Sequence, residues 1–283
     1  MAVPTRLLHQ SPLRSAVRRV RRVQLAGMRF SRWLIEPNYA PQYASELPNV
    51  CVGTVRSPMV RIGAHPELER GKRHNVSLAC TAIDGLALSP AQPFSFWRAV
   101  GPVNQQRGFI AGMELQAGCA VPTIGGGICL LSNALYQLAV EAGWAIVERH
   151  GHTAAVAAID ALDATVAYPH VDLRFAPTGP VVLSAGVRGD VLVVSAWATT
   201  ALDRTVTIER DVSELPGVPI LYRVRIHRTV VHGGQTERSL ISDETRRKLD
   251  ASQPTCLSCN ETSCDAGNRL LQRAGLRRDP VAR

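Results

Sequence analysis

The spacing of apolar residues predicts helices in the first half of the chain. A helix is expected over residues 66–88, where Leu68 begins an apolar series that continues at intervals of three and four: Val76, Ala79, Ile83 and Leu86. Ser89 and Pro90 are expected to end it, because a residue before proline avoids helical backbone. The next segment, "QPFSFWRAVG", is expected to be a short strand that leads into a glycine turn.

The clearest helical pattern is "LLSNALYQLAVEAG", residues 130–143. Its apolar face is formed by Leu131, Leu135 and Leu138, and Gly143 follows as a typical helix end. The next segment, "WAIVERH", is apolar and β-branched, which predicts a strand.

From about residue 163 onward the pattern indicates strands. In "VDLRF", Val171, Leu173 and Phe175 alternate with polar residues, and a hairpin is expected to turn at Gly189-Asp190. "PILYRVRIHRTVV" alternates most regularly. The chain therefore predicts an α+β fold, in which early helices and the helix after the "GGGIC" turn pack on a mostly antiparallel sheet.

Positive charge changes the interpretation of the first segment. The net charge is +9, and eight arginines precede the first acidic residue, Glu36. This arm is either a solvated, partly helical extension or a basic amphipathic helix on an anionic membrane surface. The residues that would form the apolar side of such a helix are Val17, Val20, Leu25, Trp33 and Leu34.

Other targets for this charge are disfavoured. No motif that reads nucleic acid accompanies the arginines, so no specific nucleic-acid partner is expected. No window reaches the roughly 18 apolar residues of a membrane span, and Arg29 and Arg32 interrupt the apolar run that an export signal needs. A cytoplasmic location is expected, with peripheral membrane contact as the alternative. Without an export signal, the seven cysteines favour reduced thiols.

Composition and pattern divide the chain into five expected parts. Residues 1–40 form the basic arm, 41–69 a linker, 70–200 the main domain, 201–250 a β extension, and 251–283 a cysteine cluster with a basic tail.

Cys129 follows three glycines at a predicted helix start. Unpaired N–H groups and the helix dipole favour a negative sulfur there, and the following helix and strand can return His150 or His152 to the same end. Asp163 can orient an imidazole as the third member of a Cys-His-acid set. Alternatively, Cys129 is only a small apolar residue in a crowded turn.

Four blocks of sequence resemble the VanW family: "FSFWRAVGPVNQQRGFIAGMEL", "VPTIGGGICLLSNALY", "VERHGHT" and "DATVAYPHVDLRF". They lie in the family's order within about residues 70–200. The resemblance implies a bacterial cell-envelope and glycopeptide-resistance context, with no established reaction.

The resemblance also assigns individual positions. The family's glycines and cysteine correspond to Gly125, Gly126, Gly127 and Cys129, and its "ER..H" element corresponds to Glu148, Arg149 and His152. This correspondence favours His152 over His150. The family usually has Gln directly after the cysteine, where this chain has Leu130. The contact that such an amide would make is therefore not expected here.

These residues suggest a thiol mechanism, in an order along the chain that is similar to transglutaminase-like and papain-like enzymes. Cys129 would attack an amide or ester carbonyl, His152 would exchange the proton, and Asp163 would orient the imidazole. Gly125, Gly126, Gly127 and Arg149 are expected to bind the substrate, for which a peptidoglycan precursor or a peptide is the expected partner. The competing hypothesis is a non-catalytic binding or scaffold protein whose "GGGIC" turn shapes a pocket.

A second cysteine group has the spacing C-x2-C-x4-C, formed by Cys256, Cys259 and Cys264. It is typical of part of a zinc site, with an iron–sulfur cluster or free, redox-paired thiols as alternatives. A fourth ligand would come from Cys119, His227, His232 or Asp265. Such a site predicts a metal- or redox-responsive protein, whereas the main domain is expected to need no cofactor.

Overall fold

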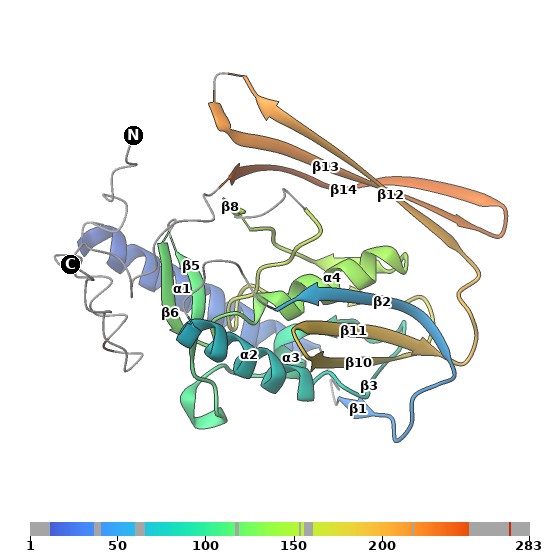
Figure 1. Cartoon of the computed structure of the whole chain (residues 1–283), viewed down its shortest axis with the longest axis horizontal. Helices are drawn as coiled ribbons and strands as arrows, with labels where there is room; N and C mark the ends of the chain where they lie inside the picture. Colours follow the sequence, from blue (N-terminus) through green and yellow to red (C-terminus); the bar gives the residue numbers. More distant parts are fainter. Residues whose placement is uncertain are drawn as a thin grey trace.

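The protein has an α+β fold, as the sequence predicts, with one central helix between two antiparallel layers (Figure 1). The computed structural model describes residues 12–36, 41–59, 66–116, 119–152, 154–155, 161–216, 218–248 and 272. The central helix is α4, Cys129–Glu141. It packs against the five-stranded sheet on one side and against β12 (Thr205–Leu215) of the second sheet on the other.

The five-stranded sheet forms the base of the fold. Its strands lie in the order β1-β3-β10-β11-β2, and every neighbouring pair is antiparallel. The hairpin between β10 and β11 turns at Gly189-Asp190, as predicted. The strand bounds are Gln42–Tyr43 for β1, Val50–Pro58 for β2, Leu86–Leu88 for β3, Val181–Arg188 for β10 and Val191–Ala198 for β11.

The second sheet is built on a long hairpin that lies across the other side of α4 (Figure 1). Strand β13 (Val218–His232) pairs antiparallel with both β12 and β14 (Gln235–Lys248). The short strand β8 (Ala154–Ala155) pairs parallel with the end of β14, at Arg247 and Lys248. This pairing brings the end of the hairpin next to the segment that follows β7 (Ala145–Glu148).

Smaller elements complete the fold. Strands β4, β9 and β7 form one sheet, and β5 and β6 form a hairpin. The bounds are Phe94–Ser95 for β4, Ala111–Gln116 for β5, Cys119–Ile124 for β6 and Arg174–Ala176 for β9. The remaining helices are α1 (Pro12–Ile35), α2 (Pro66–Thr81), α3 (Phe96–Val100) and a 3-10 turn at Gln105–Arg107.

The core forms around the apolar face of α4. Leu131, Leu135 and Leu138 are completely buried, as their helical spacing predicts. Beside them, the ring of Phe175 stacks on both Phe94 and Trp144, with centroid distances of 4.6 and 5.5 Å. Stacked aromatic rings of this kind bury large apolar areas and fix the position of β9 against the helix.

The predicted helix over residues 66–88 is too long. α2 ends at Thr81, Ile83 lies in the following turn, and Leu86 lies on β3. Gly85 has a φ of +80°, a left-handed conformation that reverses the chain into the sheet. Both residues are still buried, because a turn and a strand deliver them to the same core as the helix.

Two other expectations also need correction. Residues 50–58 were expected to be linker, but they form β2, whose pairing with β11 is not visible in a weakly alternating sequence. In "QPFSFWRAVG" the strand is limited to β4, and α3 follows at once. The reason is local: Ser95 caps α3, its Oγ accepting a hydrogen bond from the Arg98 N–H at 3.3 Å.

The described part of the arm is the helix α1, and its last turns are docked on the protein. Arg29 is only 8% exposed, and its guanidinium donates to the Glu148 carboxylate at 2.8 Å and to the His170 carbonyl at 3.1 Å. Glu36 binds Arg174, and the ring of Trp33 lies 6.5 Å from that of Tyr168. The arm is therefore not simply a solvated extension. Of the described helices, none has both the length and the apolar character to cross a membrane.

Candidate functional site

The "GGG" turn brings three backbone segments into close contact. A Cβ on Gly126 would lie 2.2 Å from the carbonyl oxygen of Gly112 on β5, a distance that no real Cβ tolerates. Gly125 and Gly127 have φ angles of +78° and +97°, and their open sides are filled by Val103 and Lys72. The turn therefore packs tightly on α2 and β5 before it enters α4.

These contacts give the glycines a structural role, and their substrate-binding role stays a prediction. They were expected to bind substrate because glycine permits close approach, and the structure does show close approach. The groups that approach are, however, the protein's own backbone and side chains. The glycines position the start of α4.

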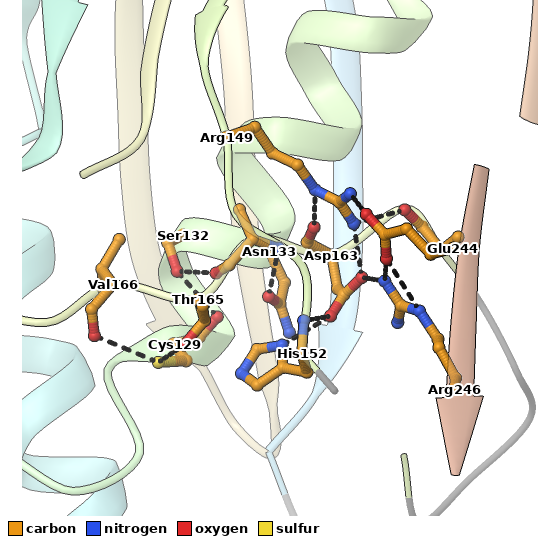
Figure 2. A network of polar contacts seen from close by, with 12 residues as sticks. Cys129, Ser132, Asn133, Arg149, His152, Asp163, Thr165, Val166, Glu244 and Arg246 are labelled. Carbon is orange, nitrogen blue, oxygen red and sulfur yellow. Dashed lines mark hydrogen bonds and ion pairs between the residues drawn. The ribbon is translucent and has the colours of Figure 1, made fainter. Parts of the chain in front are cut away.

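Cys129 is the first residue of α4, and its thiol is half-buried. The Sγ atom lies 3.9 Å from Thr165 Oγ1 and 3.9 Å from the Val166 carbonyl oxygen (Figure 2). The His152 side chain lies near enough to this thiol for Cys129 to raise the pKa of His152. The sulfur thus has two weak polar partners and an imidazole nearby.

His152 connects this sulfur to a carboxylate. Its Nδ1 lies 2.5 Å from Asp163 Oδ2, and its backbone N–H donates to the same oxygen at 3.1 Å. Burial lowers the pKa of His152, but the hydrogen bonds to Asp163 and Cys129 more than offset this effect and raise the pKa to about 9. Figure 2 shows the imidazole between the two partners. The structure therefore brings Cys129, His152 and Asp163 together in that order.

Asp163 is almost fully buried and is held by two arginines. Arg246 of β14 donates to Oδ1 at 2.5 Å, and Arg149 donates to the same atom at 2.8 Å. Burial raises the pKa of Asp163, but the hydrogen bonds from His152 and Arg246 outweigh it and hold the pKa well below its usual range. The carboxylate stays charged and can keep the imidazole oriented.

Arg149 is committed to the protein interior. Its guanidinium also binds Glu244, the Asp163 carbonyl at 2.6 Å and the Ala161 carbonyl at 2.9 Å. It lies over the ring of Tyr136 at 4.9 Å, and only 7% of the side chain is exposed. These contacts do not fit the predicted substrate-binding role, because the donors of the fork already have acceptors. Arg149 positions Asp163 instead.

Residues 161–166 carry Asp163 in an extended segment without strand pairing, although a strand was expected there. Two side chains of α4 hold the segment in place. Ser132 Oγ donates to the Ala164 carbonyl at 2.6 Å, and the Ala164 N–H donates to Asn133 Oδ1 at 2.9 Å. The helix that begins with Cys129 therefore also fixes the position of the carboxylate.

The sequence interpretation missed the contribution of the hairpin. Glu244 and Arg246 lie on one face of β14 and complete the charged cluster around Asp163, Arg246 being only 1% exposed (Figure 2). Alternating polar residues on a strand are typical of a solvated face, so the pattern alone gives no signal of burial. The pairing of β14 with β8 is what brings these side chains to the site.

The predicted metal ligands Cys256, Cys259 and Cys264 lie outside the described residues. Within the described ranges, no group of three or more His, Cys, Asp or Glu side chains is arranged to hold a metal ion. The zinc site thus stays a prediction.

Comparison with known proteins agrees with the resemblance in the sequence. The family described as "VanW like protein" matches residues 71–197. The uncharacterized protein YoaR of Bacillus subtilis (strain 168) is 29% identical over 151 residues, which cover 52% of this chain and 50% of YoaR. The vancomycin B-type resistance protein VanW of Enterococcus faecalis (strain ATCC 700802 / V583) is 29% identical over 112 residues, covering 38% of this chain and 41% of that protein.

These relatives are longer than the matched part, since the chain spans half or less of the length of each. No solved structure matches the chain. The match over residues 71–197 includes the glycine turn, Cys129, His152 and Asp163. This segment of the chain is therefore similar to the VanW-like family.

Proposed function

We propose that the protein transfers or hydrolyses acyl groups through the thiol of Cys129. The observation that carries this proposal is the grouping of three side chains: the His152 ring lies near enough to Cys129 for the thiol to raise its pKa, and its Nδ1 lies 2.5 Å from Asp163 Oδ2. Covalent acyl transfer depends on this arrangement: a nucleophile, a base beside it, and a third group that orients the base.

The first step of the proposed reaction forms a thioester. The Cys129 thiolate bonds to the carbonyl carbon of an amide, and the tetrahedral intermediate collapses as the C–N bond breaks. His152, whose pKa is raised to about 9, is protonated at neutral pH and donates its proton to the leaving amine. In the second step, neutral His152 takes a proton from water or an acceptor amine, which attacks the thioester. The C–S bond breaks and the Cys129 thiolate leaves, so the starting thiolate and protonated His152 are restored.

The start of α4 supplies donors for the oxyanion. The turn bonds there run from the Ile128 N–H to the Gly125 carbonyl and from the Leu130 N–H to the Gly127 carbonyl. Among the contacts of the described residues, the N–H groups of Gly127 and Cys129 have no acceptor, and no side chain caps the helix. Backbone N–H groups beside a nucleophile stabilise the charge that develops on the carbonyl oxygen.

The proposed substrate class is the peptide part of a cell-wall precursor. Support comes from the relative VanW, whose name connects it with resistance to vancomycin. An amide-containing peptide also suits the chemistry, because its amine leaving group needs the proton that His152 carries.

Alkylation of the described cysteines by iodoacetamide, followed by peptide mass spectrometry, tests the thiol. We expect Cys129 at pH 7 to react about tenfold more slowly in His152→Ala, because the imidazolium no longer stabilises the thiolate. Cys51, which is exposed on β2, serves as the internal reference. Cys80, whose pKa burial raises to about 12, is expected to stay unmodified.

The matched control is His150→Ala. His150 is exposed and lies two residues away, bonded to Glu148 at 3.3 Å, so its removal should leave the reaction of Cys129 unchanged. A Cys129 that reacts equally fast in both variants would rule out the Cys-His nucleophile. The family domain would then be better explained as a non-catalytic binding module.

Acylation is tested with p-nitrophenyl acetate as a simple acyl donor. We expect an acetyl adduct on Cys129 in the wild type and none at this site in Cys129→Ala. A reactive thiol that never forms the adduct would contradict acyl transfer.

A further inference from the structure

We infer that the apolar face of α1 binds the surface of an anionic lipid membrane. This face consists of six residues, each more than half exposed: Val17, Val20, Val23, Met28, Leu34 and Ile35. Val17, Met28 and Ile35 are separated by eleven and seven residues, close to whole helical turns, so they align along the helix. Gln24 and Ser31 interrupt this line with polar side chains, but the exposed apolar residues around them still mark an interaction surface.

The apolar face points away from the protein. Arg29 and Trp33 lie on the opposite side of α1, where Arg29 is bonded to Glu148 and Trp33 packs near Tyr168. The orientation is unusual, since an amphipathic helix on a domain normally turns its apolar side to the core. Here the side that carries Arg29 and Trp33 is docked, and the exposed apolar face stays available for a partner outside the molecule.

Charge identifies the partner. Residues 12–35 contain seven arginines and no acidic residue. Arg21 and Arg32 are exposed and lie eleven residues apart, on one flank of the apolar face. A helix with an apolar face and arginines beside it lies in the plane of a membrane interface, where the arginines meet anionic headgroups.

A second copy of the chain fits this face less well. A symmetric contact would bring the arginine-rich flanks of two identical helices together, since each copy uses the same surface. α1 itself has no acidic side chain, and Glu36, which follows it, is hydrogen-bonded to Arg32 alone of the two flank arginines named above, so Arg21 would meet its copy without a balancing charge from α1. An anionic lipid membrane can bury the apolar residues of α1 and neutralise its arginines at the same time.

Co-sedimentation of the full chain with vesicles tests the inference. We expect binding to vesicles that contain phosphatidylglycerol, little binding to phosphatidylcholine alone, and weaker binding at high salt. The double variant Val20→Glu/Met28→Glu should lower the affinity for phosphatidylglycerol vesicles by about tenfold or more. Both residues are exposed, so the fold should tolerate the change.

Val212→Glu is the matched control, because Val212 is an exposed apolar residue on β12, away from α1. It should bind the vesicles like the wild type. Failure of the wild type to bind, or equal binding by the double variant, would overturn the inference. Sedimentation without lipid adds one more outcome: a wild-type dimer that the double variant converts to a monomer would assign the face to a second copy instead.

Discussion

The protonation of His152 determines what this site can do. Burial alone would lower the pKa, but the bonds to Asp163 and Cys129 raise it to about 9, so the imidazolium dominates at neutral pH. The folded-state pKa lies above the ordinary value of 6.5. These bonds therefore stabilise the fold fully below about pH 6.5, and this contribution is lost as the pH rises through about 9.

Removing either partner of His152 should shift its titration. We expect the NMR signal of the His152 ring to titrate with a midpoint near pH 9 in the wild type, and at lower pH in Asp163→Asn. Cys129→Ala should shift it in the same direction while keeping the arginine contacts of Asp163 intact. Asp190→Asn, at an exposed hairpin turn, is the control and should change nothing. An unshifted midpoint in both site variants would contradict the assigned contacts.

The glycines illustrate what a single residue type can and cannot predict. The run Gly125 to Gly127 correctly indicates a sharp turn and a close approach of other atoms. It does not say which atoms approach. The closest neighbour of Gly126 is the carbonyl of Gly112, and this pairing depends on where the β5–β6 hairpin lies. A run of glycines is found both where a ligand approaches the backbone and where a strand packs against it, so the sequence does not distinguish the two.

At the scale of elements, the sequence predicts contacts between residues that are close along the chain, and it misses contacts between residues that are far apart. Cys129 begins α4, His152 lies just after β7, and Asp163 lies in the extended segment 161–166, so their convergence follows from local patterns. Arg246 lies 83 residues from Asp163, and the pairing of β14 with β13 and β8 places it there. Strand pairing over such a separation is not encoded in any local pattern, because many registers satisfy the same alternation.

Removing the guanidinium that the hairpin contributes should destabilise the fold. Arg246→Met leaves the buried carboxylate of Asp163 with fewer donors, and we expect a loss of about 3 kcal/mol in the free energy of unfolding, measured with urea. Arg238→Met, on the same strand, removes an exposed pair with Glu209 and should cost less than about 1 kcal/mol. Equal effects of the two changes would show that the hairpin does not support the site.

At the scale of the whole molecule, one strand connects the arm with the site. Glu148 at the end of β7 binds Arg29 of α1, and the next residue, Arg149, holds Asp163. Composition predicted the basic arm but not this docking, because Glu148 and Arg29 are 119 residues apart. Burial raises the pKa of Glu148, but the hydrogen bond from Arg29 outweighs this and lowers it, so the pair keeps its charges down to acidic pH.

Breaking this pair should release the helix without dismantling the domain. In Glu148→Gln the carboxylate that anchors Arg29 is lost, and we expect trypsin to cleave after Arg29 and Arg32 about tenfold faster, since cleavage requires local opening of α1. Glu141→Gln is the matched control, because Glu141 is exposed on α4 and, among the described residues, is hydrogen-bonded to Gln137. Mass spectrometry of the fragments reports the cleavage sites. If cleavage is unchanged while the domain stays folded, the Arg29–Glu148 pair does not hold α1, and other contacts such as those of Trp33 with Tyr168 and of Glu36 with Arg174 do.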